Sequence, residues 1–410
     1  MRAMAISLVM ALPCVYAYAQ MPAQSAPDFI PAGVSGNDST ITVSLITCFP
    51  GPEIYELCGH SAIRVRGENI DSVWNFGIFD FNQPNFIYRF VKGETDYKGM
   101  AYPFRWFLPE YEARGSKVVE QDLNLKPEEA WNLLGILRES VLPENATYRY
   151  NYVKDNCSTR IIDKVEESSE RNIIYPDTLR YGTFREEMRA YHEGYPWYQF
   201  GIDLALGSGL DYKLTPREEM FVPVELMRNA ASAKFADGEP LVKETRVLVP
   251  GSERPVLPDT PWFFGPLLWS WIAAILTFCI AGADIRRKKI SLPYYILWFC
   301  MVGLTGCLSA FLVFVSVHEA TSPNALIFWL NPLQFAFVAG LIFKKLKSLA
   351  IAMAYYNIIV VGVLVIVSPF LRQSFNASFY PLMLATVALG AAYAINCYKK
   401  SYKKRTKKRR

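Results

Sequence analysis

The stretch Cys58-Gly-His-Ser-Ala-Ile-Arg-Val65 precedes Tyr150-Asn-Tyr-Val-Lys-Asp-Asn-Cys-Ser-Thr-Arg160 by almost a hundred residues, and these two stretches decide the fold of the first half of the chain. The first is typical of a strand, because polar and apolar residues alternate after His60. The second is typical of a helix start, because the Asp-Asn pair before Cys157 can cap a first turn. An imidazole on a sheet is therefore expected beside a thiol at a helix N-terminus.

Such a pair predicts nucleophilic catalysis by a thiolate. The N–H groups and the dipole at a helix start favour the thiolate of Cys157, and His60 can hold its proton. The N–H of Cys157 could also donate to a developing oxyanion. A third polar group should orient the imidazole, and we assign this role to Asn75 on the expected neighbouring strand. A lone cysteine at a helix start is commonplace, so the prediction rests on its pairing with one of only three histidines.

The surrounding pattern predicts an α+β domain. Strands are expected at residues 41–47, 60–65, 73–77, 117–124 and 148–153, and helices at 127–140 and from Cys157 onward. We place this exported domain at residues 35–240. Residues 241–262 are rich in proline and charge and are expected to be a linker.

The two ends of the chain indicate a membrane protein. Residues 1–19 have the basic start, apolar run and small-residue end of a secretory signal peptide, although an uncleaved membrane helix is the alternative. Five apolar stretches, each long enough for a helix that crosses ~30 Å of hydrocarbon, form an all-α transmembrane domain at residues 263–397. They cover residues 263–282, 293–317, 325–343, 349–370 and 380–397.

The charges between these stretches set the expected topology. Basic residues gather at 286–289, at 344–347 and in the tail 398–410, whereas the intervening loops carry almost none. The positive-inside rule puts the basic segments in the cytoplasm and the first half of the chain outside. A basic tail beside a membrane helix is typical of a topology signal, so we expect no nucleic-acid partner.

The exported domain contains three cysteines, so at least one thiol stays unpaired within the chain. Cys48 and Cys58 lie ten residues apart in a turn-rich stretch and could form a disulfide, which would leave Cys157 free. Acidic residues elsewhere in the domain follow no spacing typical of metal ligands, so no metal site is expected.

The residues around His60 and Cys157 resemble the circularly permuted papain-like (NlpC-type) thiol enzymes, which include lecithin:retinol acyltransferase. The whole chain resembles more closely the Lnb-type lipoprotein N-acyltransferases of Bacteroidota. The matching stretches are residues 47–51, 59–65, 151–160 and 200–203, together with the multi-span second half. No second histidine matches the orienting residue of the retinol enzyme, so the resemblance does not itself support the role expected for Asn75.

The resemblance implies acyl transfer at the bacterial inner membrane, with the catalytic domain in the periplasm. Cys157 would take an acyl chain from a membrane phospholipid as a thioester, and the N-terminal amine of a diacylglyceryl-cysteine lipoprotein would accept it. His60 would act as base and acid, and no cofactor or metal is implied. His318, Glu319 and Asn331, at the outer ends of the second and third apolar stretches, could contact the headgroup or the amine. A hydrated loop with a helix cap is the equal alternative for these three.

Two other functions remain open at this point. A thiol hydrolase of the same fold could cut cell-wall peptides or amides, with the helices as a mere anchor. A non-enzymatic envelope assembly factor could carry the Cys–His pair incidentally. Five apolar stretches exceed what an anchor requires, and this favours a lipid substrate.

Overall fold

The structure, a computed structural model, describes residues 40–79, 84–254 and 258–408, with side chains as far as residue 399. The predicted signal peptide lies outside the described residues. The chain divides into two compact units. The sheet unit comprises Met1–His192 and Lys213–Pro258, and the helical unit comprises Glu193–Tyr212 and Asp259–Arg410.

An antiparallel sheet of seven strands, in the order β6-β4-β3-β2-β1-β5-β9, forms the sheet unit. The strands are β1 Thr42–Cys48, β2 His60–Arg66, β3 Asp71–Ile78, β4 Asp96–Pro103, β5 Val118–Leu123, β6 Thr147–Arg149 and β9 Val242–Val249. The remaining elements of this unit are η2 Ile54–Glu56, α2 Phe86–Lys92, α3 Phe104–Arg114, α4 Pro127–Glu139, α5 Cys157–Ser168, β7 Ile173–Ile174, α6 Phe184–Tyr191, α8 Pro216–Glu219, α9 Pro223–Ser232 and β8 Lys234–Phe235.

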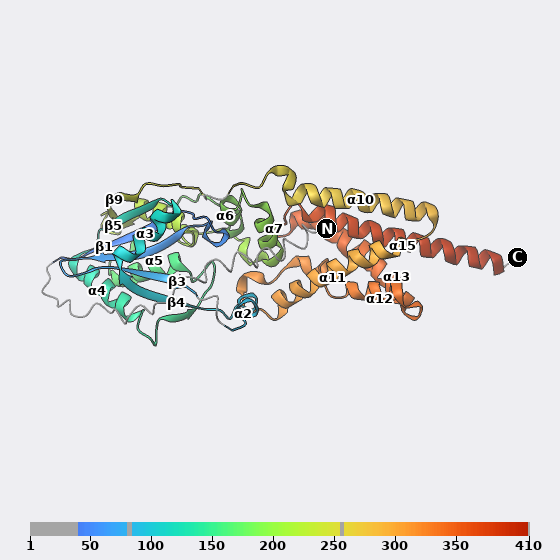
Figure 1. Cartoon of the computed structure of the whole chain (residues 1–410), viewed down its shortest axis with the longest axis horizontal. Coiled ribbons are helices and arrows are strands. Elements are labelled where there is room, and N and C mark those ends of the chain that lie inside the picture. The colour runs from blue at the N-terminus through green and yellow to red at the C-terminus, as the bar shows by residue number, and fades with distance from the viewer. Residues whose placement is uncertain (1–39, 80–83, 255–257, 409–410) are drawn as a thin grey trace. The chain divides into compact units, whose positions relative to one another are not determined.

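The sheet is covered on both faces because its central strands are apolar on both. Helix α3 lies against one face of the sheet (Figure 1). Ala62 and Val73 share a buried cluster with its residues. Ile63 and Trp74 share another buried cluster with residues of α4, α5 and α9 on the opposite face. Strand side chains alternate between faces, so both layers come from the same strands. The expected α+β architecture is confirmed for this unit.

Two predicted boundaries in this unit are wrong. Part of the expected linker, residues 241–262, is the edge strand β9, which pairs with β5 and extends the sheet. The charged side chains of this segment predicted a linker. They also suit an edge strand, which pairs with one neighbouring strand and exposes its other edge to solvent. The expected strand 148–153 ends at Arg149, because the following residues turn toward α5.

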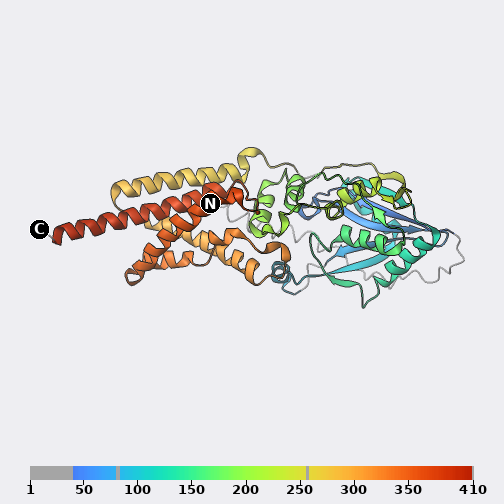
Figure 2. The ribbon, with the colours of Figure 1, turned by 180° about the vertical axis from the view of Figure 1, so that it is seen from behind.

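The helical unit is almost entirely helical. Its elements are α7 Pro196–Ala205, η3 Ser208–Leu210, η4 Trp262–Phe264, α10 Pro266–Arg287, α11 Leu292–Phe314, η5 Glu319–Thr321, η6 Ala325–Phe328, α12 Gln334–Ile342, η7 Lys344–Leu346, α13 Lys347–Tyr356, the π-helical turn η8 Asn357–Val361, α14 Gly362–Val367, η9 Ser368–Phe370 and α15 Phe379–Lys408. Helices α10 and α15 run side by side (Figures 1 and 2). Within the described residues, four helices are long and apolar enough to cross a membrane: 266–287, 292–314, 344–370 and 379–399.

The third of the five expected spans is not one continuous helix. It is a 3-10 turn, η6, followed by a loop and the nine-residue helix α12. Pro332 lies between them, and proline lacks the N–H that a helix would require. The Asn331 side chain donates to the carbonyl oxygens of Ile327 at 3.1 Å and Phe328 at 3.4 Å, so it compensates for the interrupted helix. The interruption is therefore built into the sequence.

The segment Glu193–Tyr212, which precedes the end of the sheet unit in the sequence, belongs to the helical unit. Asn324 donates to the Leu204 carbonyl oxygen at 3.1 Å, and Asn376 donates to the Asp203 carboxylate at 2.9 Å. Phe200 of α7 also makes an edge-to-face contact with Phe379, with centroids 5.0 Å apart. The predicted domain 35–240 is therefore too inclusive, because Glu193–Tyr212 packs with the helices.

Candidate active site

Cys157 is the first residue of α5, and the preceding residue holds the helix start in place. The Asn156 side-chain oxygen accepts from the N–H groups of Ser158 at 2.8 Å and Thr159 at 3.0 Å. Its amide nitrogen donates to the carbonyl oxygens of Tyr152 and Phe221, both at 2.8 Å. Asn156 thus caps two N–H groups that have no partner within the helix, and its side chain links the helix start to the segment at Phe221.

His60 begins β2 opposite Cys48 in the register with β1. The residue before it, Gly59, has φ of +79°, a region that residues with a Cβ rarely adopt. A Cβ at Gly59 would also lie 2.5 Å from the Cys48 carbonyl oxygen. Glycine is therefore required for the chain to enter β2 at this point, which explains the Cys-Gly-His order.

The imidazole is oriented by Asn75 of β3. His60 Nε2 and Asn75 Oδ1 are 2.6 Å apart, and because an amide oxygen only accepts, Nε2 carries the proton. The Asn75 amide nitrogen donates to the Tyr102 hydroxyl at 2.9 Å, which fixes the direction of the amide. Tyr102, on β4, was missed by the sequence analysis. Only the pairing of β4 with β3 places Tyr102 next to Asn75, and the sequence pattern predicted no strand over the residues of β4.

The thiol and the imidazole are in contact. The side chains of Cys157 and His60 share a hydrogen bond. Because Nε2 bonds to Asn75, we infer that Nδ1 is the nitrogen that bonds to the sulfur. The backbone N–H of Ser61 also donates to the sulfur. Both side chains are half-buried. The structure thus brings together the three residues expected to form the site, from two strands and a helix start.

The electrostatics of this pair favour charge separation. Burial alone would raise the pKa of the Cys157 thiol, but the His60 charge and the hydrogen bonds from His60 and Ser61 bring that pKa below its ordinary value. Burial alone would lower the pKa of His60, but the Cys157 charge and the hydrogen bonds that the imidazolium donates to Cys157 and Asn75 raise it. A thiolate and an imidazolium therefore stabilise each other, as a nucleophilic cysteine requires.

The Cys48–Cys58 disulfide that the spacing allowed does not form, and both residues are free thiols. Cys48 is fully buried in the cluster beneath α3, where it shares a hydrogen bond with Tyr111. The Cys58 sulfur lies 3.6 Å from the Tyr152 hydroxyl. Burial raises the pKa of Cys58 to about 12, so this neighbouring thiol stays protonated.

The other expected site residues belong to the helical unit. His318 precedes η5 and Glu319 begins it. Asn331 differs from the prediction, because it is buried and its amide is engaged within the unit. Besides the two carbonyl groups that it caps, it donates to the Tyr356 hydroxyl at 3.1 Å and accepts from the Leu333 N–H at 3.1 Å. Its role in the structure is to hold the turn before α12.

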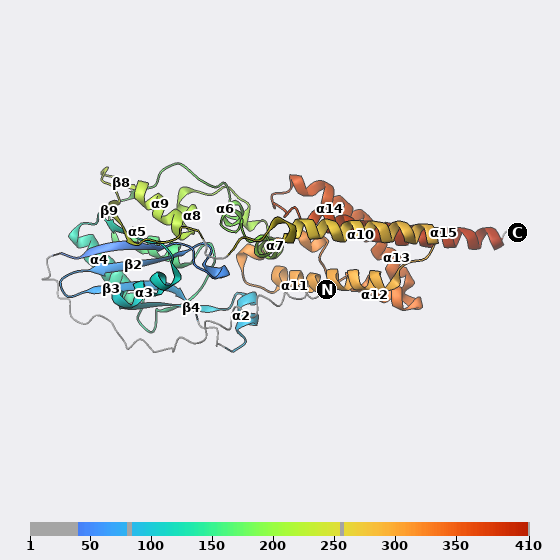
Figure 3. The same cartoon turned by 45° about the horizontal axis from the view of Figure 1, so that its top comes forward.

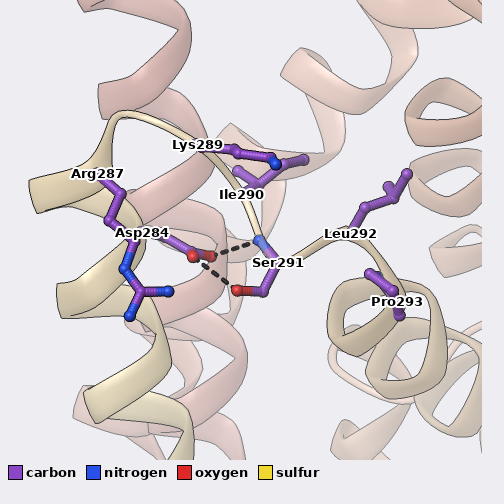
Figure 4. Close-up of a pocket in the computed structure, with 7 residues that line it drawn as sticks. All are labelled: Asp284, Arg287, Lys289, Ile290, Ser291, Leu292 and Pro293. Atoms are coloured by element: carbon purple, nitrogen blue, oxygen red, sulfur yellow. Dashed lines mark hydrogen bonds between the residues drawn. The ribbon is translucent and has the colours of Figure 1, made fainter.

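A cavity of about 400 Å³ lies in the helical unit at the turn between α10 and α11 (Figure 4). Asp284, buried there, accepts from the N–H of Ser291 at 2.9 Å and from its hydroxyl at 2.7 Å. These bonds fix the turn, and the cavity lining contains no thiol and no imidazole. The cavity is lined by Asp284, Arg287, Lys289, Ile290, Ser291, Leu292 and Pro293. Over the described residues, no group of three or more His, Cys, Asp or Glu side chains could hold a metal ion.

Comparisons with known proteins identify both halves of the chain. Residues 35–185 match the model of the Lnb N-terminal periplasmic domain, and residues 258–401 match the model of the Lnb transmembrane domain. No curated protein and no solved structure matches the chain. His60, Asn75 and Cys157 all fall within the first match. Since the two models together cover well over half of the sequence in this order, the chain belongs to the Lnb family, with a periplasmic sheet domain followed by a transmembrane domain.

Proposed function

We propose that this protein is a lipoprotein N-acyltransferase with Cys157 as its nucleophile. The observation that carries the proposal is the polar chain Cys157–His60–Asn75 at a helix start, in a periplasmic domain joined to a transmembrane domain. A thiolate with an oriented imidazole suits acyl transfer through a covalent intermediate. The transmembrane domain favours substrates that reside in a membrane.

In the first half-reaction, the Cys157 thiolate attacks the ester carbonyl carbon of a phospholipid. The oxyanion that forms would accept from the Cys157 N–H, which lies in the uncapped part of the first turn. As the intermediate collapses, the ester C–O bond breaks and the His60 imidazolium gives its proton to the departing glycerol oxygen. A lysophospholipid leaves, and the acyl chain stays on Cys157 as a thioester.

In the second half-reaction, the neutral N-terminal amine of a diacylglyceryl-cysteine lipoprotein attacks the thioester carbon. His60 takes the proton that the amine loses, and the C–S bond breaks to regenerate the thiolate of Cys157. The product is an amide, so the lipoprotein gains a third acyl chain. Every proton moves through the His60–Cys157 pair, and this route requires no metal or soluble cofactor.

The proposed setting is the bacterial inner membrane, with the C terminus in the cytoplasm. The basic segments at 286–289 and 344–347 and the tail would lie on the cytoplasmic side. Consistent with this arrangement, Gln373 donates to Asn324 at 2.9 Å, so the two sparsely charged loops meet at one end of the helical unit. The phospholipid and the lipoprotein would both approach from the periplasmic leaflet.

The test uses the full-length protein in proteoliposomes that contain phospholipid and a synthetic diacylated lipopeptide. We expect mass spectrometry to show one added acyl group on the N-terminal amine, and an acyl group on Cys157 when the lipopeptide is omitted. Cys157→Ala should abolish both products, whereas Cys279→Ala, at an exposed thiol of α10, should abolish neither. Release of free fatty acid without amide would indicate a hydrolase, and activity that survives Cys157→Ala would refute the thiol mechanism.

A further inference from the structure

The surroundings of Cys157 on the side of β3 are aromatic. A Cβ at Gly77 would lie 3.6 Å from Cys157 Cβ and 3.9 Å from the Tyr150 ring, so Gly77, Cys157 and Tyr150 meet beside the thiol. Gly77 has φ of +88° at a bulge in β3, a conformation that suits glycine, and it presents no side chain to the other two residues. Tyr150 therefore forms an apolar wall beside the reacting sulfur.

From this wall a continuous row of rings leads away from the thiol. Tyr150 stacks on Tyr97 with centroids 4.2 Å apart, and Tyr97 contacts Phe79 at 4.9 Å. Phe79 stacks on Phe86 at 5.9 Å, and Phe86 stacks on Phe90 at 6.0 Å. The row, which we call the aromatic track, is thus at most about 21 Å long. One leaflet of a ~30 Å hydrocarbon core is roughly 15 Å deep, so the length of the aromatic track is comparable with that of one long acyl chain.

The outer end of the aromatic track is continuous with an exposed apolar surface. Helix α2 stands beyond the end of the sheet, beside the start of β4 (Figure 3). Its side chains Ile87, Tyr88 and Phe90 are 53%, 54% and 49% exposed. Tyr55 of η2 joins this surface, because its ring meets Phe79 edge-on at 6.4 Å and is 45% exposed. Exposed apolar side chains that gather in this way mark a binding or membrane-contact surface.

The charges beside this surface do not oppose contact with lipid. Arg89 pairs with Asp96 at 2.9 Å, and Lys92 pairs with Glu94 at 2.6 Å, so the cations of α2 are neutralised within the sheet unit. No acidic residue lies within α2 itself. The surface also runs directly into the aromatic track, and the track ends at the thiol. A hydrocarbon chain matches both features, whereas a protein partner would not require apolar rings that continue from the surface to Cys157.

Building on the proposed function, we infer that the aromatic track binds the acyl chain of the donor phospholipid, and that Ile87, Tyr88 and Phe90 form the tip that enters the leaflet to admit it. The ester carbonyl would then lie at Cys157, with the chain running past Tyr150, Tyr97 and Phe79 toward α2. The ligand class is a long-chain acyl group. Selectivity for its length would come from the number of rings it covers.

Photo-cross-linking tests this binding without requiring turnover. Full-length protein with Cys157→Ser is placed in vesicles of a phospholipid whose acyl chain carries a diazirine near the carbonyl or near the terminal methyl. We expect the first probe to label Tyr150 or Tyr97 and the second to label Phe86 or Phe90. Labelling at other positions of the sheet unit, or an α2 that stays unlabelled, would overturn the inference.

Kinetics of a matched pair give a second test. Ile87→Asp and Ile174→Asp change the same residue type at nearly equal exposure, 53% and 58%, but only Ile87 lies at the tip. We expect Ile87→Asp to lower the ratio of rates with long-chain and short-chain donors at least tenfold, and Ile174→Asp to leave that ratio unchanged. Equal ratios for the two variants would overturn the inference. Correct cross-links without any N-acylated product would refute the proposed function alone.

Discussion

The amide oxygen of Asn75 accepts the Nε2 proton of His60 at 2.6 Å, and this bond leaves Nδ1 as the ring nitrogen available to Cys157. With Nε2 protonated, Nδ1 can accept the thiol proton or donate to the thiolate. The opposite tautomer would present an N–H to a neutral thiol and could not take its proton. The Asn75 bond therefore selects the competent form of the base.

The lowered pKa of Cys157 predicts alkylation at a pH below that of an ordinary thiol. We expect iodoacetamide to modify Cys157 rapidly at neutral pH, because its thiolate is paired with His60. His60→Ala should move the alkylation midpoint upward and slow acyl transfer by about 10²–10⁴-fold. Cys58 serves as an internal control, because its pKa of about 12 keeps it unreactive. Peptide mapping by mass spectrometry after timed alkylation measures both sites, and equal rates at the two would contradict the ion pair.

Removal of the Tyr102 hydroxyl should loosen the orienting amide without touching the thiol. In Tyr102→Phe the Asn75 nitrogen loses its acceptor, and one such hydrogen bond contributes about 1 kcal/mol. We expect kcat to fall several-fold and the pH midpoint of the rate to move, because the His60 tautomer is less well selected. Tyr111→Phe, whose hydroxyl contacts Cys48, is the control and should leave that midpoint in place. A purely structural role for Tyr102 would change stability but not the midpoint.

A side chain at Gly59 should be far more costly than one at an open glycine of similar conformation. Gly59→Ala and Gly238→Ala both place a Cβ on a backbone with positive φ, which costs roughly 1–2 kcal/mol. Only at Gly59 would the Cβ also meet a backbone oxygen, whereas the site at Gly238 is open. We expect Gly59→Ala to show the larger fall in Tm and to displace His60, with loss of activity. Similar Tm values for the two variants would argue against the close approach of Cys48.

The buried carboxyl of Glu187 predicts a pH-dependent stability. Both of its oxygens lack a hydrogen-bond partner among the described residues, and burial, with Glu225 and Glu219 nearby, raises its pKa to about 10. Below the ordinary pKa of 4.5, Glu187 is protonated in both the folded and the unfolded state, so its titration costs the folded state no stability. Above that pH the unfolded carboxyl ionises while Glu187 stays protonated, so the free energy of unfolding falls by about 1.4 kcal/mol per pH unit until pH approaches 10.

Replacement of Glu187 by glutamine removes this dependence. Between pH 5 and pH 7 we expect the Glu187→Gln protein to gain about 3 kcal/mol relative to the parent, as measured by urea unfolding in detergent. Glu128→Gln, at an exposed residue of α4, is the control and should follow the parent across this range. A parent and a Glu187→Gln protein with parallel pH profiles would show that Glu187 ionises in the folded state.

The sequence predicted best the elements that local rules govern. The alternation of residues in β2 located His60, and the Asp-Asn pair before α5 located Cys157. The resemblance to the Lnb family is confirmed by the two family matches. The basic clusters and apolar stretches likewise located the helical half. These features depend on neighbours within a few residues, so a single sequence reveals them.

Features that depend on distant partners were missed or misread. Strand β9 looks like a linker until its pairing with β5 is known, and Tyr102 has no role until β4 lies beside Asn75. The cysteine spacing allowed a disulfide, but Cys48 faces the α3 cluster and Cys58 faces Tyr152. The broken third span followed from Pro332, whose effect a count of apolar residues does not register.

The membership of Glu193–Tyr212 in the helical unit has a practical consequence for dissecting the protein. The chain passes between the units at 192, 212 and 258, so no single cut separates them. A secreted fragment that stopped at Pro258 would carry α7 with the apolar side of Phe200 uncovered and the Leu204 carbonyl unbonded. Such a fragment would be prone to aggregate, and its solubility would depend on excising this insertion or on supplying the remaining helices in trans.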